Sequence, residues 1–366
     1  MNSVEELKQY AGVHARGLEI ADYEQVLARV EHDGEGPGSW AGEWTAEGDR
    51  LAAADRHVEA SRRYLMARFP FVDGPARQEA YDKSLTTFAR WREGQDVHRV
   101  DVEFEGRTLG AWVTGLDASR PRPLVLVMGG FLTVKEQWAP TLPVFARLGM
   151  AAVGLEMPGV GENQVPYDRE SHRFLSAVLD TLADRADVSR TYALAMSFSG
   201  HQALRCAMDD PRIRGVVTVG APISAFFTDT EWRKELPRVT VDTLAHLTGA
   251  EPAAMEDWAL PAEKLAALDI PVAYVESLQD EVIPSADPRF LRKHVRDLRT
   301  LVHDDVHGSP LHVEENKPWL TLSLLRMQGA RDLRTLLLSA MWNTARARSR
   351  LSGLLRPSGR RAPAGT

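Results

Sequence analysis

From residue 97 onward, short apolar runs alternate with longer stretches of helical spacing, and this alternation restricts the fold more than any other feature. Continuous apolar strands that alternate with helices are typical of βαβ units, whose parallel sheet is covered on both faces. Before them, "HRVDVEFEG" and "LGAWVTG" predict an antiparallel hairpin. We therefore expect an α/β fold with a mostly parallel central sheet and helices on both faces. The predicted parallel strands are residues 123–128, 150–156, 191–196, 213–220, 270–276 and 298–303.

Two helical segments lie outside this alternation. Residues 1–95 carry apolar residues at helical spacing, as in "RLAAADRHVEASRRYLMARF". The interval between "TVGAP" and "DIPVAYVE" has helical patches but no strand, and an insertion there lies over the carboxyl edge of the sheet, where a lid belongs. The expected division is an N-terminal helical segment contributing to a cap (1–96), a first part of the core (97–220), a helical cap insertion (221–267), a second part of the core with a C-terminal helix (268–343), and a disordered tail rich in Arg, Ser, Gly and Pro (344–366).

Composition excludes several classes of protein. The chain has 366 residues, 44% of them hydrophobic, which is enough for a full core. Its net charge of -7, with both signs mixed, provides no basic field for nucleic acid. A single cysteine, Cys206, excludes a disulfide framework and a cysteine-rich metal site. The N-terminus lacks the pattern of a signal peptide, and no apolar stretch reaches the ~18 residues of a membrane span. We expect a cytoplasmic protein with neither a nucleic-acid nor a membrane partner.

The stretch "ALAMSFSGHQA" suggests a nucleophile at a sharp turn between a strand and a helix. Around Ser197 the pattern is small-x-Ser-x-small, with Ala195 and Ser199 replacing the usual glycines. A nucleophile elbow requires small residues at these positions because the turn leaves no room for larger ones. Centring the turn on Ser199 would put the bulky His201 two residues further on, so Ser197 is the better candidate. The alternative is that the serine only caps a buried helix.

A serine nucleophile needs a base and an acid that orients the base, and in this topology the chain order is Ser, acid, His. Asp280 follows the predicted strand "IPVAYVE", and His307 follows the predicted strand "LRTLVH". We therefore expect Ser197, Asp280 and His307 to form a catalytic triad. Alternatively, the aspartate only forms a turn and the histidine is a solvated loop residue. The rival acids are Glu276, Glu281, Asp304 and Asp305, and His303 is expected to end its strand.

An oxyanion hole requires backbone N–H donors beside the nucleophile. One should be the N–H of Phe198, the residue after the nucleophile, and the second should come from the loop "VMGGFLTVKEQW". The glycine pair lets that backbone approach closely, which indicates the N–H of Phe131 or of Gly130. The alternative is that the glycines only ease a turn from strand to helix.

The glycine-rich stretch "GLEMPGVGEN" (154–163) matches neither a P-loop nor a dinucleotide-binding pattern, and we interpret it as a structural turn beside the site. No spacing of His, Cys or acidic residues indicates a metal site. We expect neither a metal nor an organic cofactor.

Together, "AMSFSG", "MGGFLTVKEQW", "EMPGVGEN", "QDEVIP" and "DDVHGSP" resemble the α/β-hydrolase superfamily over roughly residues 97–313. The second and third of these motifs, after a helical segment containing "SRRYLMARFPF", are similar to the FrsA-like esterase group, which includes dihydropseudooxynicotine hydrolase and fungal polyketide-shortening hydrolases. This resemblance implies a helical cap made from the N-terminal segment and an insertion, and it suggests a homodimer. Several members of the group cleave a carbon–carbon bond next to a ketone.

The sequence therefore predicts a serine hydrolase that acts on an acyl ester, or on a carbon–carbon bond adjacent to a ketone, of a small to medium apolar substrate. The resemblance implies that this substrate is polyketide-like. Phe226, Phe227 and Trp232 are candidates for lining the substrate pocket. An acyltransferase or cyclase would use the same triad with another acceptor. A binding protein with the same fold but no catalysis is the alternative from a different class.

Overall fold

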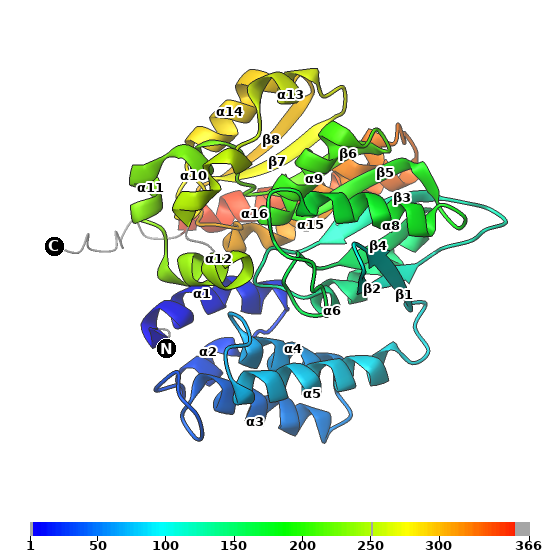
Figure 1. Cartoon of the computed structure of the whole chain (residues 1–366). Helices are drawn as coiled ribbons and strands as arrows, with labels where there is room; N and C mark the ends of the chain where they lie inside the picture. The colour runs from blue at the N-terminus through cyan, green and yellow to red at the C-terminus, as the bar shows by residue number, and fades with distance from the viewer. Residues whose placement is uncertain (1–2, 250–251, 356–366) are drawn as a thin grey trace.

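The computed structural model describes residues 3–249 and 252–355. Its centre is an eight-stranded sheet in the order β1-β2-β4-β3-β5-β6-β7-β8 (Figure 1). The strands β1 and β2 form an antiparallel hairpin that joins β4, and β3 to β8 are parallel. The strands are β1 (His98–Phe104), β2 (Arg107–Thr114), β3 (Pro123–Met128), β4 (Ala151–Leu155), β5 (Asp187–Met196), β6 (Ile213–Val219), β7 (Val272–Ser277) and β8 (Leu298–His303). The expected hairpin and parallel strands are confirmed.

The apolar runs are continuous because both faces of the central strands are covered. In β3, Leu124 and Leu126 pack into a cluster shared with helices α8 and α9. The alternate residues Val125 and Val127 pack into a cluster on the other face, with α7 and α15. The covering helices are α6 (Lys135–Trp138), α7 (Leu142–Arg147), α8 (Phe174–Leu182), α9 (Phe198–Asp209), α13 (Ala262–Ala267), α14 (Ala286–His294) and α15 (Val313–Met327), with short 3-10 turns η1 (Ala139–Thr141), η2 (Ser171–Arg173) and η4 (Pro310–His312).

Strand β5 begins at Asp187, before the predicted start at residue 191. Its first residues pair with the start of β3, where the Asp187 N–H donates to Arg122 O at 2.8 Å. This part of the strand is polar and largely exposed, so hydrophobic periodicity does not detect it.

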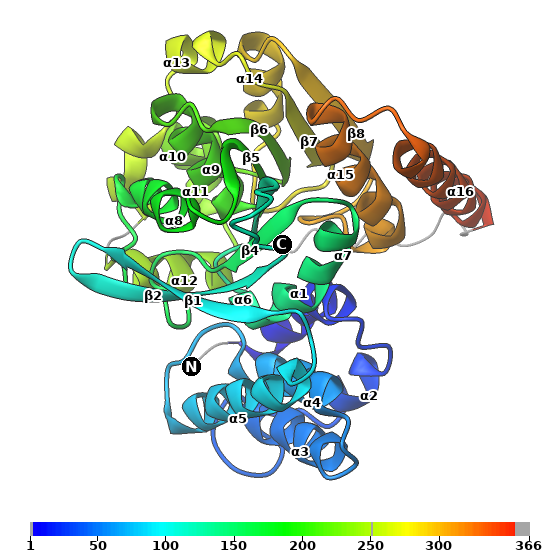
Figure 2. The same ribbon diagram turned by 90° about the vertical axis from the view of Figure 1, so that its right-hand side faces the viewer.

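The N-terminal segment is helical, as expected, but it shares its core with the sheet. Its helices are α1 (Val4–Gly17), α2 (Tyr23–Leu27), α3 (Trp40–Ala52), α4 (His57–Arg68) and α5 (Pro75–Arg92). Figures 1 and 2 show α2 to α5 as a separate layer, with α1 between that layer and the rest of the molecule. Leu7 and Trp40 are fully buried in the same apolar cluster as Leu124 of the central strand β3.

Within the described part of the interval 221–267, residues 221–249 and 252–267, there are helices and no strand. These helices are α10 (Ala225–Thr228), α11 (Thr230–Lys234), α12 (Arg238–Thr248), η3 (Pro252–Trp258) and α13. The first turn of this interval is fixed by the buried carboxylate of Asp287, which accepts the backbone N–H groups of residues 223–226. The Val239 N–H at the start of α12 donates to Glu6 Oε1 of α1 at 2.9 Å. The two segments expected to form a cap therefore touch each other, while the division of the chain at these boundaries stays a prediction.

The expectation of a disordered tail from residue 344 is wrong for residues 344–355, because helix α16 spans Leu333–Leu355. Compositional reasoning counted the arginines and serines as a sign of disorder. Arginine, alanine and leucine are among the best helix formers, and they dominate this stretch. Residues 356–366 lie outside the described residues.

No helix in the described part of the chain combines the length and apolar character needed to cross a membrane.

Candidate active site

Ser197 stands at the turn between β5 and α9, with backbone angles φ 56° and ψ -125°. A serine in this region is strained and persists only where its surroundings fix it. Its N–H donates to Val219 O at 2.8 Å, and a Cβ on Gly200 would lie 2.0 Å from Thr218 Oγ1, so α9 packs closely on β6. The expected strand-to-helix turn with a partly exposed serine is present.

Ser199 is placed differently from Ser197. It is fully buried, and its Oγ donates to Met196 O at 2.9 Å and contacts Met128 O at 3.3 Å. The flanking His201 is also buried, with Nε2 2.9 Å from Trp258 O, and burial lowers its pKa to about 3. Neither side chain can therefore act as an exposed nucleophile or base, and the turn centres on Ser197.

The structure brings the three predicted triad residues together. Ser197 Oγ lies 3.0 Å from His307 Nε2, and His307 Nδ1 lies 2.9 Å and 3.0 Å from the two carboxylate oxygens of Asp280. Burial of the imidazole acts to lower the pKa of His307, but the Asp280 charge and hydrogen bond, with the charge of Glu281, outweigh it and raise the pKa above its ordinary value. A neutral His307 that donates its Nδ1 proton to Asp280 leaves Nε2 free to accept from the serine hydroxyl.

Asp280 makes both kinds of contact that its sequence position allowed, a turn and a hydrogen bond to the histidine. Its Oδ1 accepts the N–H groups of Val282 at 2.9 Å and Ile283 at 2.7 Å, which forms a turn, while both oxygens also contact His307. The rival acids are engaged elsewhere: Glu276 with Arg292, Glu281 with the His307 N–H, Asp304 with Gln279, and Asp305 with His312. His303 does end β8, and its Nε2 lies 2.8 Å from Asn316 Oδ1.

Gly220, which follows β6, is a site residue that sequence reasoning did not single out. Its φ is +58°, and a Cβ there would lie 2.9 Å from His307 Cε1 and 3.4 Å from Asp280 Oδ2. Only glycine combines this backbone conformation with the close approach of the imidazole. A glycine at the last position of a predicted strand, at the edge where the loops carrying Ser197, Asp280 and His307 were expected to meet, was the available signal.

The loop after β3 approaches the nucleophile as the glycine pair suggested. A Cβ on Gly130 would lie 3.4 Å from Ser197 Cβ, and one on Gly129 would overlap Thr133 Oγ1 at 1.8 Å. Phe198 is the first residue of α9, and the first N–H groups of a helix have no acceptor within it. The Phe131 and Phe198 rings lie 4.5 Å apart, which keeps the two proposed oxyanion segments together.

The three residues proposed to line the pocket lie in different surroundings. Phe226 is buried against the ring of Phe198 at 5.1 Å, and Phe227 is buried against Phe226 and His201. Phe227 therefore lies in the aromatic core behind the elbow, and the structure does not bring it to the triad. Trp232 is half-buried and donates Nε1–H to Val282 O at 3.0 Å, close to the triad acid.

Helix α1 contributes side chains to the site that the sequence did not identify. Val13 Cγ1 lies 3.5 Å from where a Cβ on Gly308 would stand, next to His307. Burial raises the pKa of Tyr10, and the carboxylates of Glu281 and Asp280 raise it further. Burial lowers the pKa of His14 to about 4, and the positive charges of His307 and Arg68 contribute. Helical spacing showed that this helix has a buried face, but not what the face covers.

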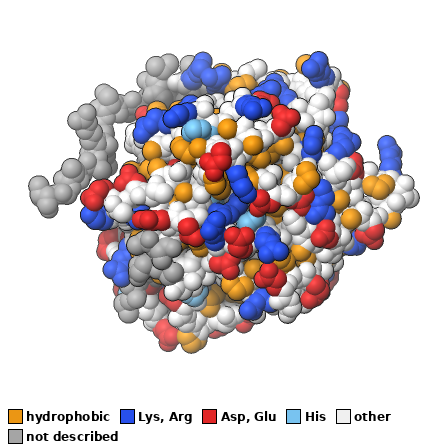
Figure 3. Space-filling model, turned by 45° about the horizontal axis from the view of Figure 1, so that its top comes forward, with side chains coloured by type: hydrophobic (Ala, Val, Ile, Leu, Met, Phe, Trp, Pro, Cys, Tyr) orange, Lys and Arg blue, Asp and Glu red, His pale blue; other side chains and the backbone are white. Residues whose placement is uncertain are grey.

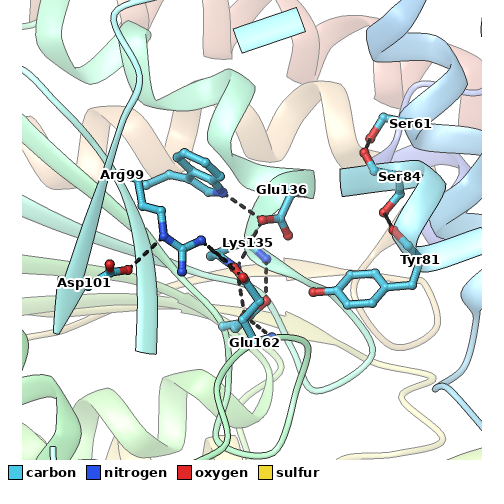
Figure 4. A network of polar contacts seen from close by, with 10 residues as sticks. Ser61, Tyr81, Ser84, Arg99, Asp101, Lys135, Glu136 and Glu162 are labelled. Atoms are coloured by element: carbon cyan, nitrogen blue, oxygen red, sulfur yellow. Dashed lines mark hydrogen bonds and ion pairs between the residues drawn. The ribbon is translucent and has the colours of Figure 1, made fainter. Parts of the chain in front are cut away.

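A buried ionic network surrounds the start of α6 (Figure 4). It directly follows the loop after β3 that carries the proposed oxyanion donors, residues 129–134, hereafter the oxyanion loop. Lys135 Nζ contacts Glu136 and Glu156 at 3.1 Å each and Glu162 at 2.5 Å, and the lysine side chain is fully buried. The Glu156 and Glu162 carboxylates belong to the glycine-rich turn 154–163, so this turn is structural, as interpreted from the sequence. A Cβ on Gly161 would lie 2.4 Å from Glu156 Oε2. The network joins the start of α6 to the end of β4, and sequence reasoning missed it.

No group of metal-ligating side chains occurs within residues 3–249 and 252–355. Acidic and basic side chains are interspersed on the face that Figure 3 presents. On that face there is no continuous basic field of the kind that nucleic acid requires.

Comparisons with known proteins agree with this fold. A family model described as Esterase FrsA-like matches residues 38–266. The curated Esterase FrsA of Photobacterium profundum is 24% identical over 83% of the chain and 84% of its own length. The Esterase FrsA of Vibrio cholerae is 26% identical, and the match spans 64% of either protein.

Two solved structures extend the comparison. The AbyA5 wild-type structure is 47% identical and has a TM-score of 0.90, covering 94% of this chain and 99% of its own. The 2,6-dihydroxy-pseudo-oxynicotine hydrolase is 16% identical with a TM-score of 0.65, over 92% and 96%, which is a likeness of fold alone. The expected α/β-hydrolase fold is confirmed.

Proposed function

The chain belongs to the FrsA-like esterase family, and from that membership and the geometry of its site we propose a serine hydrolase with Ser197 as nucleophile, His307 as base and Asp280 as orienting acid. Membership makes it a hydrolase of the α/β-hydrolase fold. The observation that carries the proposed triad is the continuous set of contacts, 3.0 Å from Ser197 Oγ to His307 Nε2 and 2.9 Å from His307 Nδ1 to Asp280.

In the proposed reaction, Ser197 Oγ attacks the substrate carbonyl while His307 Nε2 takes the hydroxyl proton. The resulting oxyanion accepts N–H groups of Phe198 and of Phe131 or Gly130. Collapse of the tetrahedral intermediate breaks the bond to the leaving group, which takes the proton from His307. Water, deprotonated by His307, then hydrolyses the acyl-enzyme. Each oxyanion donor contributes about 10²–10³ in rate.

The proposed substrate is a small to medium apolar acyl ester, or a ketone with a cleavable carbon–carbon bond. In the second case the leaving group is an enolate, which His307 protonates on carbon. Both reactions use the same attack and the same oxyanion hole. An acyltransferase or cyclase would differ only in the acceptor that attacks the acyl-enzyme.

Labelling with a fluorophosphonate tests the nucleophile. We expect the wild-type protein to be labelled and Ser197→Ala to lose all labelling, while Ser199→Ala, the matched control two residues away, keeps it. Labelling of Ser197→Ala at the wild-type level would contradict the assignment. An unlabelled wild-type protein would favour a binding protein without catalysis. Product analysis by mass spectrometry, with aryl esters and β-diketones as substrates, then separates ester from carbon–carbon cleavage.

A further inference from the structure

The N-terminal segment carries two polar side chains that the proposed reaction does not use: Arg68, which contacts the loop after β3, and His14, which is close to His307. Arg68, the last residue of α4, is 4% exposed, and its Nη1 donates to Leu132 O at 3.1 Å. Leu132 follows Phe131 in the oxyanion loop. The guanidinium of Arg68 is therefore anchored one residue from a proposed oxyanion donor.

The charge of Arg68 is not neutralised by a neighbouring carboxylate. Within residues 3–249 and 252–355 no acidic side chain forms an ion pair with it. Its side-chain hydrogen bond is the one from Nη1 to Leu132 O, and Nε is buried without a partner. Its other close contact is the Tyr81 ring, 5.7 Å from the guanidinium carbon. The carboxylates whose charges act on the Arg68 pKa, Glu156 and Glu136, are already paired with Lys135.

A buried guanidinium without a carboxylate is costly, and a single carbonyl contact and one ring do not offset its lost hydration. A buried polar group left without partners requires an explanation, such as a ligand or an ion that completes its contacts. Because the guanidinium is planar and presents parallel N–H donors, its best complement is a carboxylate, which accepts two of them at once.

His14 of α1 is close to both Arg68 and His307, whose positive charges add to the effect of burial in lowering its pKa. The His14 ring lies 4.8 Å from the ring of Phe69, the residue that follows Arg68 in the chain. The distance from His14 to His307 is short enough for the His307 charge to lower the His14 pKa. No group in the described part of the chain is hydrogen-bonded to the His14 ring nitrogens. The imidazole is neutral near pH 7, so it can donate an N–H without adding positive charge.

Four elements surround these two side chains: α1, α4, the loop after β3, and α12. The last of these carries His246, whose pKa is lowered by burial and by the positive charge of Arg68. Figures 1 and 2 show α1 between the N-terminal helical layer and the body of the molecule. We propose that Arg68 and His14 bind a carboxylate of the substrate, so that the enzyme prefers substrates with a carboxylate near the carbonyl that Ser197 attacks. This inference rests on the proposed function of Ser197.

The test uses two matched pairs of esters that differ only in charge. In one pair the charge is on the acyl side, 4-nitrophenyl hydrogen glutarate against 4-nitrophenyl methyl glutarate. In the other it is on the leaving group, 4-acetoxybenzoate against its methyl ester. The measured quantity is the ratio of kcat/KM for the anionic ester to kcat/KM for the neutral one. We expect the wild-type enzyme to favour the anionic member of at least one pair.

In Arg68→Gln this ratio should fall by about 10- to 100-fold, the range expected for a lost hydrogen bond to a charged group. Arg68→Lys keeps the positive charge but loses the planar pair of N–H donors, so it should lower the ratio by less than Arg68→Gln does. If the glutamine variant does not fold, the lysine variant takes its place in the test. Arg62→Gln is the control, because Arg62 is on the same helix but pairs with Glu19 at 3.0 Å. It should leave the ratio unchanged.

Two results would overturn this inference: a wild-type enzyme that favours the anionic ester in neither pair, or a ratio unchanged in both Arg68 variants. An equal loss on charged and neutral esters leaves the ratio unchanged and would assign Arg68 a structural role only. Fluorophosphonate labelling of the same samples separates these results from failure of the proposed function, since labelled Ser197 shows that the nucleophile is intact.

Discussion

At the scale of single residues, the site depends on side chains whose positions are fixed by contacts on several sides. The strained backbone of Ser197 is held by its N–H bond to Val219 O and by the close packing of Gly200 on Thr218. Asp280 accepts from His307 Nδ1, and Glu281 accepts the His307 backbone N–H. The imidazole fits beside Gly220 because that residue has no side chain. Substitutions at these supporting residues should therefore change activity without removing a reacting group.

Glu281→Gln should move the acid limb of the kcat/KM profile to lower pH. His307 must be neutral to accept a proton, and Glu281 is among the charges that raise its pKa against the effect of burial. Removing that charge makes the imidazolium less stable, so the pKa falls, while the glutamine oxygen can still accept the His307 N–H. The measurement is kcat/KM between pH 5 and 9 on a neutral aryl ester.

Glu314→Gln is the control for this shift, because Glu314 is exposed on α15 and pairs with Lys317. An acid limb that stays at the same pH in both variants would contradict the proposed role of His307 as the base.

Gly220→Ala should lower kcat/KM by about 100-fold, because the new methyl group displaces His307 and small misplacements of a catalytic group cost about that much. Positive φ adds a stability loss of about 1–2 kcal/mol. Gly106→Ala is matched in backbone strain, with φ +74°, but a Cβ there meets nothing within 4 Å. Gly106→Ala should lower the thermal unfolding temperature but leave kcat/KM unchanged. An equal kcat/KM in Gly220→Ala and Gly106→Ala would refute the steric argument.

At the scale of helices and strands, α1 connects the N-terminal segment to the insertion and to the histidine loop. Its buried residues Leu7, Ala11 and Ala15 lie in the main core. On adjoining sides, Val13 packs beside Gly308, and Glu6 accepts the N–H of Val239 at the start of α12. Pro237 caps α12 without a side-chain hydrogen bond, so Glu6 takes over that function from another helix.

Glu6→Ala should destabilise the first turn of α12 by about 0.5–2 kcal/mol, the usual value of a lost N-cap. We expect faster amide hydrogen exchange in residues 238–248. Glu5→Ala, in the same first turn of α1, is the control for a change in helix-dipole energy. Equal acceleration in both variants would show that α12 does not depend on the contact from Glu6.

Lys135→Met should destabilise the protein by about 3–5 kcal/mol, because it leaves buried carboxylates without their cation. Burial already raises the pKa of Glu156, and without Lys135 it would rise further. The loss of stability should therefore be smaller at acidic pH, where these carboxylates take up protons. Urea unfolding at pH 5 and pH 8 measures this difference, and a loss that is independent of pH would contradict it.

At the scale of the whole molecule, the N-terminal helices and the sheet share one apolar core. One apolar cluster includes Leu7 and Trp40 as well as the central strands, and Arg68 anchors the oxyanion loop. Removal of the first 95 residues would therefore expose apolar core surface and destabilise the whole protein. Loss of activity in such a deletion would not show whether these residues contribute to a cap over the site.

We expect a single cooperative unfolding transition, with equal calorimetric and van't Hoff enthalpies. A separate early transition of the N-terminal segment, seen as two peaks in scanning calorimetry, would contradict this prediction. The homodimer implied by the family resemblance also stays a prediction, which light scattering coupled to size-exclusion chromatography can test.

The sequence by itself determined the α/β class, the apolar part of each parallel strand, and the order in which Ser197, Asp280 and His307 follow three strands. These features are local, because hydrophobic period and turn chemistry depend on each segment and its own burial. Composition alone misjudged residues 344–355, where good helix formers continue α16. Aromatic content alone could not tell that Phe227 lies in the core.

Only the tertiary structure decided which distant segments meet. The hydrophobic periodicity of α1 does not indicate that Tyr10 and His14 lie close to Asp280 and His307. Periodicity shows that one face of a helix is buried, but it is the same whichever surface that face covers. The clearance at Gly220, the ionic partners of Lys135 and the unpaired charge of Arg68 likewise depend on segments far apart in the chain. Such contacts arise when separately encoded elements pack together, and a single sequence carries no direct record of that pairing.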